Sequence, residues 1–99
     1  KGSVHYIIGT PPLVNHPTQS QFVEKVIRQS FGEDTFELID PVMGGEDFSY
    51  YLLKKPGAFI FVGMGSEKSA YPHHHPRFDI NEDVLPDAVK LFIEIIKNY

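Results

Sequence analysis

The order of hydrophobic and polar residues along the chain predicts three strands alternating with three helices. Runs rich in β-branched and aromatic residues between glycines and prolines are typical of strands. Apolar residues spaced three or four apart instead predict a helix with one buried face. The strands are expected at residues 3–8, 35–39 and 58–64, and the helices at residues 18–31, 46–54 and 81–98. This alternation predicts an α/β layer arrangement.

The first and last helices carry the clearest local signals. Thr18 and Gln21 have the spacing of a capping box, and Gly32 is suited to end the first helix. Pro86 is tolerated only in a first turn, so the regular part of the last helix is expected to begin at Leu85. The predicted core stripes are Phe22, Val23, Val26, Ile27 and Phe31 in the first helix and Leu85, Ala88, Val89, Phe92, Ile95 and Ile96 in the last.

A proline-rich connector over residues 10–17 follows the first strand and is the best candidate for a domain boundary. The chain has no initial Met and opens on a strand, which needs a partner strand. We therefore expect a segment of a longer protein. The run AFIFVGM at residues 58–64 is continuously apolar and predicts a strand buried on both faces.

Composition and charge narrow the classes of partner. The 99 residues carry a formal net charge of −4, and Lys and Arg are scattered. This argues against a nucleic-acid or anionic-membrane surface as the main partner. There is no Cys, so thiolate chemistry and disulfides are excluded within the chain. No signal peptide and no bilayer-length apolar run is visible, and a cytoplasmic location is expected.

Three adjacent histidines, His73, His74 and His75, lie in a polar loop predicted over residues 65–80. Neutral imidazole is a good ligand for zinc and similar divalent ions. Neighbouring side chains point apart, so one of the three is expected to bind a metal together with ligands from elsewhere. The competing interpretation is a surface histidine cluster with adventitious metal affinity, and the spacing alone leaves both open.

A second candidate is the segment Gly44, Gly45 and Glu46 at the start of the predicted middle helix. Glycines let the backbone approach a ligand closely, and free N–H groups at a helix start attract anions such as carboxylates. The simpler interpretation is a Gly-Gly turn followed by acids that favour the first helical turn. Taken alone, the segment favours the simpler interpretation.

Four blocks in order carry a family resemblance: PPLVNHP, MGGEDFSYYL, PGAFIFVGMG and HHHPRFDINEDVLP. Together they resemble the aminoacylase-like metallopeptidases, and more closely their N-acyl-amino-acid amidohydrolases, which include hippurate hydrolases, auxin-conjugate hydrolases and N-acetyldiaminopimelate deacetylases. The resemblance covers essentially the whole chain. It implies an α/β fold, in which this chain is the C-terminal part of a three-layer, zinc-peptidase-like catalytic domain.

The same resemblance implies a role for each segment. Residues 1–10 correspond to the last strand of a smaller lid or dimerisation domain, and residues 11–99 to the C-terminal portion of the catalytic domain. Aligning Pro76 and Phe78 with the family motif places the metal ligand at His74. His73 and His75 remain alternatives that support the ligand or face the substrate. The segment Gly44, Gly45 and Glu46 matches a stretch near the substrate carboxylate.

The activity implied is hydrolysis of an N-acyl-L-amino acid by a homodimeric enzyme that uses one or two divalent ions, zinc, manganese or cobalt. A glutamate acts as general base. By resemblance this glutamate and the other ligands lie upstream of Lys1, so no catalytic residue is assigned within the chain, and the chain alone is expected to be inactive. Two other classes compete with this hypothesis: a binding or assembly module without catalysis, and a small metal-buffering protein.

Overall fold

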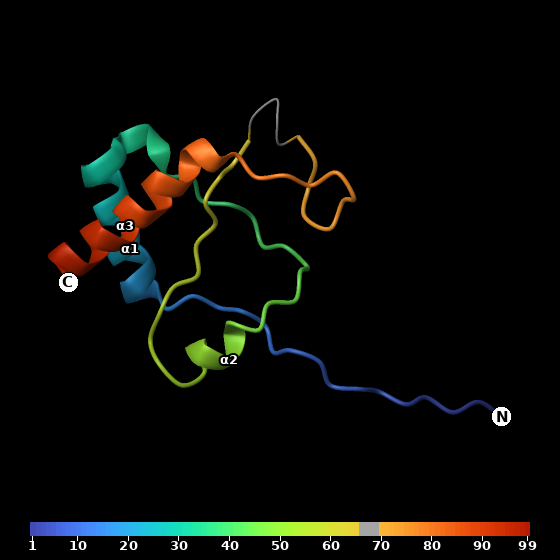
Figure 1. The fold of residues 1–99 in the computed structure, drawn as a ribbon. Helices are drawn as coiled ribbons and strands as arrows, with labels where there is room; N and C mark the ends of the chain where they lie inside the picture. The colour runs from blue at the N-terminus through green and yellow to red at the C-terminus, as the bar shows by residue number, and fades with distance from the viewer. Residues whose placement is uncertain (66–69) are drawn as a thin grey trace. The chain divides into compact units, whose positions relative to one another are not determined.

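The computed structural model describes residues 1–65 and 70–99, and it divides into two compact units. One unit contains Lys1–Val23 and Glu37–Phe59, and the other contains Glu24–Phe36 and Ile60–Tyr99. Figure 1 shows the chain as helices joined by long extended segments. The described elements are α1 (Pro17–Phe31), the 3-10 helix η1 (Glu33–Thr35), α2 (Ser49–Leu52), the 3-10 helix η3 (Glu82–Val84) and α3 (Leu85–Asn98).

Helix α1 confirms the first predicted helix almost residue for residue. It begins at Pro17, whose fixed φ suits the first helical position, rather than after a Thr18 cap. Gly32 ends the helix with φ 113°, and its N–H donates to the carbonyl oxygen of Arg28 at 3.0 Å. Of the predicted stripe only Val26 is buried, and the other four side chains are half-buried.

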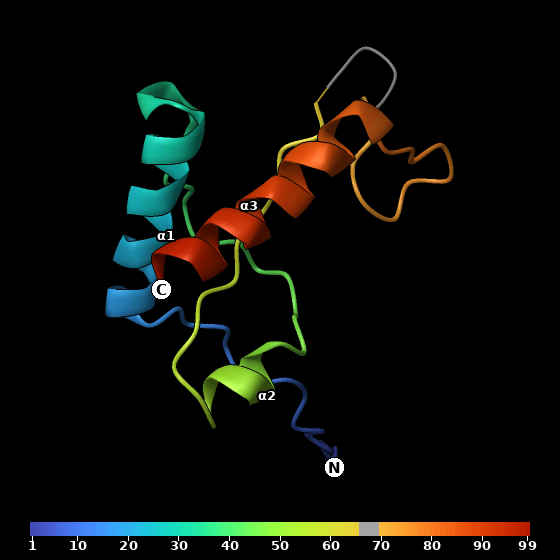
Figure 2. The ribbon, with the colours of Figure 1, turned by 60° about the vertical axis from the view of Figure 1, so that its left-hand side comes forward.

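Helix α3 begins at Leu85 as predicted, with Pro86 in its first turn and the short helix η3 before it. Asn81 caps η3, because its side-chain oxygen accepts the N–H of Asp83 at 3.2 Å. The last-helix prediction therefore holds. Figure 2 shows α3 as one regular helix, coloured from orange to red. Its Lys90 Nζ lies 4.6 Å from the ring centroid of Phe31 at the end of α1.

The predicted core stripe of α3 is right only in part, because Ala88 and Ile95 are half-buried while its other four residues are exposed. Leu91, outside the predicted stripe, is the buried residue, whereas Val89, Phe92 and Ile96 are 60, 63 and 76% exposed. The periodicity was ambiguous because α3 is apolar on two sides: Ala88, Leu91 and Ile95 follow one row, and Leu85, Val89, Phe92 and Ile96 follow another. A helix with apolar residues on both sides is typical of an element packed between layers.

Helix α2 is shorter than predicted, with one turn at Ser49–Leu52 instead of residues 46–54. The flanking residues continue as turns, since Lys54 and Lys55 both donate N–H groups to the carbonyl oxygen of Tyr51 at 2.9 Å. Ser49 and Leu52 are buried, and the Ser49 hydroxyl has no hydrogen-bond partner within the described residues. The element therefore exists, but packing fixes only its central turn.

None of the three predicted strands forms a strand among residues 1–65 and 70–99. Residues 3–8 are extended and exposed, Thr35 belongs to η1, and residues 58–64 run without a regular ladder (Figure 1). The physical reason is that a strand needs a second strand to receive its backbone hydrogen bonds, and the apolar runs find no such partner within the described residues. Of the predicted loop over residues 65–80, residues 66–69 lie outside the described part.

Two residues of the predicted connector, Asn15 and His16, form hydrogen bonds to the backbone of Gly57 and Phe59. The Asn15 side chain donates to the carbonyl oxygen of Phe59 at 2.8 Å and accepts the Phe59 N–H at 2.7 Å. The backbone N–H of His16 donates to the carbonyl oxygen of Gly57 at 3.1 Å, and the ring nitrogen His16 Nδ1 accepts the Gly57 N–H at 3.2 Å. We call these four residues the connector clamp.

The helices within the described residues are all too short or too polar to cross a lipid bilayer.

Candidate functional site

The three histidines lie on two consecutive turns that precede η3. The His75 N–H donates to the carbonyl oxygen of Pro72 at 3.1 Å, and the Phe78 N–H donates to the carbonyl oxygen of His75 at 2.9 Å. In the first turn His74 occupies the third position with φ 68°, the conformation that type II turns require there. Among the described non-glycine residues His74 alone has a positive φ. The turn therefore sets His74 apart from its neighbours.

The three imidazoles differ in what they contact. The His73 ring meets the Phe78 ring edge-on, with centroids 5.1 Å apart. The His75 ring stacks on Tyr71 with centroids 4.3 Å apart, and its Nδ1 accepts the Arg77 N–H at 3.1 Å. The His74 ring has no hydrogen bond or ring contact within the described residues. Since all three are exposed, His74 is the imidazole most available to an external ligand.

The direction of the hydrogen bond at His75 bears on which histidine can bind a metal. Accepting at Nδ1 leaves the ring proton of the neutral imidazole on Nε2. A metal-bound histidine usually donates its other ring N–H to an oxygen, which fixes the tautomer. Nδ1 of His75 faces a donor instead, so His75 has the wrong partner for ligation through Nε2. This geometry agrees with the assignment of His74 that the resemblance implies.

The Gly44–Glu46 segment has local structural reasons for its composition. Glu46 Oε1 accepts the Phe48 N–H at 3.1 Å, so this carboxylate caps the turn that precedes α2. A Cβ added at Gly45 would lie 3.2 Å from Thr10 Oγ1, whereas one at Gly44 would meet nothing within 4 Å. Gly45 therefore permits a close approach of the connector, and Gly44 leaves its backbone open to a ligand. The predicted substrate role of these three residues stays a prediction.

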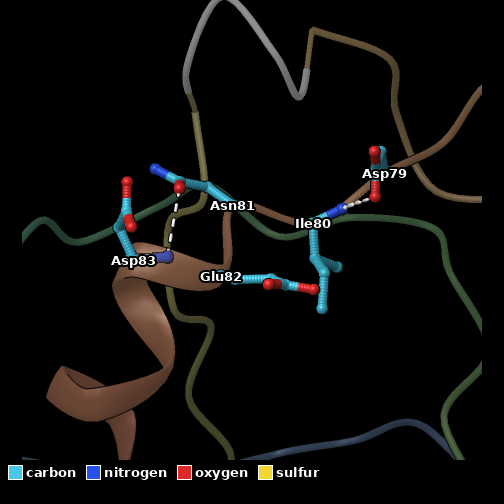
Figure 3. Close-up of a pocket in the computed structure, with 5 residues that line it drawn as sticks. All are labelled: Asp79, Ile80, Asn81, Glu82 and Asp83. Carbon is cyan, nitrogen blue, oxygen red and sulfur yellow. Dashed lines mark hydrogen bonds between the residues drawn. The ribbon is translucent and has the colours of Figure 1, made fainter.

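The two candidate segments belong to different compact units, with Gly44–Glu46 in one and His73–His75 in the other. An acidic recess at Asp79–Asp83 accompanies the histidine turns (Figure 3). Its carboxylates do not converge: Asp79 Oδ1 accepts the Ile80 N–H at 2.8 Å, and Figure 3 shows the Asp83 side chain on the opposite side of the recess. Within the described residues no three His, Cys, Asp or Glu side chains gather at distances suited to a metal ion.

Sequence reasoning missed four residues that the structure gives a role. Asn15 and His16 form the connector clamp, and Tyr71 and Arg77 hold His75. For Tyr71 a signal was present, because an aromatic four residues before a histidine in a turn-rich loop can stack on it. For Asn15 and His16 there was none, since their partners lie 41 to 44 residues away in the sequence.

Comparison with known proteins gives a consistent match. The model of a family described as Peptidase family M20/M25/M40 matches residues 2–98. YhaA of Bacillus subtilis (strain 168), named among the amidohydrolases, is 40% identical over 88 residues, which are 87% of this chain and 22% of that protein. IAA-amino acid hydrolase ILR1-like 2 of Arabidopsis thaliana is 39% identical over 90% of this chain and 20% of its own length.

A third relative widens the range of named activities. N-acetyldiaminopimelate deacetylase of Streptococcus suis (strain 05ZYH33) is 37% identical over 90% of this chain and 23% of its own length. The chain thus spans about a fifth of the length of the curated relatives it matches. These names agree with the amidohydrolase branch to which the sequence blocks were compared.

Proposed function

Because the chain belongs to peptidase family M20/M25/M40, we propose that it is the C-terminal part of a metal-dependent amidohydrolase acting on N-acyl-L-amino acids or related peptide-like amides. The relatives are hydrolases and peptidases, which supports an enzyme at the level of the family. The observation that carries the proposal is that His74, which has a positive φ, is exposed and makes no hydrogen bond or ring contact with the described residues, whereas the His73 and His75 rings do.

Family membership implies an α/β peptidase fold. We extend this to a three-layer catalytic domain over residues 11–99 and the last strand of a lid or dimerisation domain over residues 1–10. Two features support the extension. Residues 3–8 are extended and exposed along their length, which suits a strand added to another sheet edge. Helix α3 is apolar on two sides, which suits a helix packed between layers.

The described residues of this chain supply one candidate metal ligand, which would share the metal site with ligands from elsewhere. His74 would hold the ion through one imidazole nitrogen, and the remaining ligands would come from the part of the protein outside this chain, since no metal-binding group forms within the described residues. When bound, a divalent ion such as zinc, manganese or cobalt polarises the scissile carbonyl and lowers the pKa of water. The chain alone is therefore expected to be inactive.

The other parts of the reaction are divided between this chain and the rest. A carboxylate general base is expected outside the chain. The open backbone at Gly44, together with Gly45, would approach the carboxylate of a small N-acyl amino acid, and Glu46 would hold that turn through its bond to the Phe48 N–H. A homodimer joined through the lid domain completes the proposal.

The test is hydrolysis of N-acetyl and N-benzoyl amino acids by the full-length protein, after chelation and addition of manganese, zinc or cobalt. His74→Ala should lower kcat/KM on the order of a thousandfold, about 4 kcal/mol of transition-state stabilisation. His73→Ala is the matched control and should stay within a few fold. Loss at His73 with activity kept at His74 would move the ligand. No hydrolysis with any metal would favour the alternative, a binding or assembly module.

A further inference from the structure

We propose that Tyr71, His75 and Arg77 form a positioning cluster that presents His74 to the metal, and that His75 is not itself a ligand. This inference rests on the proposed function, because it names what holds the ligand of that site. The three residues lie within a seven-residue stretch of one compact unit, and their contacts with one another all fall inside that unit.

The cluster is closed by three contacts that tie each member to the other two. The Tyr71 and His75 rings are nearly parallel, at 11° and 4.3 Å between centroids. The Arg77 N–H donates to His75 Nδ1 at 3.1 Å, and Arg77 Nη1 donates to the Tyr71 hydroxyl at 3.1 Å. The guanidinium carbon also lies 5.8 Å from the Tyr71 ring centroid, within reach of a cation–π attraction. His75 therefore cannot rotate without breaking two contacts.

Fixing His75 also fixes the backbone of His74. The carbonyl oxygen of Pro72 and the N–H of His75 close the turn whose third residue is His74. A residue with a Cβ is unfavourable at φ 68° and keeps that conformation only where its surroundings impose it. The stack on one side of His75 and the Arg77 N–H on the other hold the closing residue of this turn. His74 then lies in a turn whose closing residue is held on two sides, while the His74 ring makes no hydrogen bond or ring contact with the described residues.

The chemistry of His75 explains why it serves as the support. As a ligand through Nε2 it would need a proton on Nδ1 and an oxygen to accept that proton. The Arg77 N–H at Nδ1 is a donor, so binding a metal would break the contact that shapes the turn. The two histidines thus have different roles: His75 accepts a hydrogen bond from the Arg77 backbone N–H, and His74 would donate a lone pair to the ion.

Metal affinity of the full-length apoprotein, measured by calorimetry with zinc and by the absorption spectrum of bound cobalt, tests this division. Tyr71→Leu removes the stack and should weaken zinc binding about tenfold. Tyr71→Phe keeps the stack and should stay within about threefold of wild type. His75→Asn keeps an acceptor for the Arg77 N–H but has no imidazole, so wild-type metal stoichiometry and cobalt spectrum should persist. Tyr99→Leu is the control for loss of an exposed tyrosine.

The outcomes separate the inference from the proposed function. Zinc affinity of Tyr71→Leu equal to that of wild type would overturn the cluster and leave the metal site intact. Loss of one ion per site in His75→Asn, with the ion retained in His74→Ala, would make His75 the ligand and overturn the inference as well. Absence of stoichiometric metal in the wild-type protein would instead overturn the proposed function. Near wild-type zinc affinity in Tyr71→Phe, together with wild-type metal stoichiometry in His75→Asn, would support the cluster.

Discussion

In two regions of the chain a histidine Nδ1 accepts a backbone N–H, but the two hydrogen bonds join different parts of the structure. In the connector clamp, His16 Nδ1 accepts the Gly57 N–H at 3.2 Å, and in the histidine turns His75 Nδ1 accepts the Arg77 N–H at 3.1 Å. The first pair is 41 residues apart in the sequence and the second is two apart. One bond therefore joins distant segments, whereas the other shapes a turn.

The difference teaches which property each region controls. The clamp is half-buried, and Asn15 adds two further bonds to the Phe59 backbone, so loss of the clamp removes hydrogen bonds from half-buried peptide groups. The histidine turns are exposed throughout, and water can replace any bond that is removed there. We expect the clamp to govern stability and the turns to govern the geometry of His74.

The largest effect on stability should come from Asn15→Ala. Both bonds to the half-buried Phe59 backbone disappear, and about 2 kcal/mol of local stability should be lost. Hydrogen exchange of the Phe59 amide in the full-length protein should then quicken about 30-fold. The matched control is Asn98→Ala, which removes an exposed side-chain bond to the Glu94 carbonyl oxygen. Equal exchange at Phe59 in wild type and Asn15→Ala would remove the distinction between the two regions.

A smaller effect is expected from Gly57→Ala, which leaves every clamp bond in place. The added Cβ would lie 3.0 Å from Cδ2 of the buried Leu52, and relieving this overlap should cost about 1 kcal/mol. Thermal unfolding of the full-length protein measures the change. Gly63→Ala adds a methyl where nothing lies within 4 Å and serves as control. An unchanged unfolding temperature for Gly57→Ala would show that the chain around Gly57 and Leu52 can shift without cost to relieve the overlap.

The smallest effect on stability belongs to the histidine turns. Arg77→Ala removes an exposed bond to the Tyr71 hydroxyl while the backbone N–H at His75 remains, and unfolding should change by less than about 0.5 kcal/mol. The same unfolding experiment checks this value beside Asn15→Ala. A loss of unfolding free energy comparable to that of Asn15→Ala would mean that the histidine turns also stabilise the fold, so the two regions would not differ in this respect.

Helices were predictable from the sequence because their signals are local. Gly32 ends α1 and Leu85 begins α3 as expected, each from residues within one turn. The strand predictions failed for the opposite reason, since a strand forms only with a partner and the runs at 3–8, 35–39 and 58–64 find none within the described residues. The buried face of α3 was predicted only in part because two apolar rows compete, and only packing decides that Leu91 is buried.

The candidate site divides in the same way. The histidine triplet was visible in the sequence, and the turn at His74 is closed by residues one and two positions away. What separates His74 from His75 is the direction of one hydrogen bond and one ring stack, which no sequence pattern specifies. Asn15 and His16 were missed altogether because their partners follow after more than forty residues.

The positive φ of His74 places two demands on one position that point to different amino acids. The backbone at φ 68° favours Gly or Asn, which adopt it at little cost, whereas ligation of a metal needs an imidazole. Histidine satisfies the second demand at the expense of the first. Under the proposed function, position 74 is therefore a local trade-off between backbone stability and metal binding.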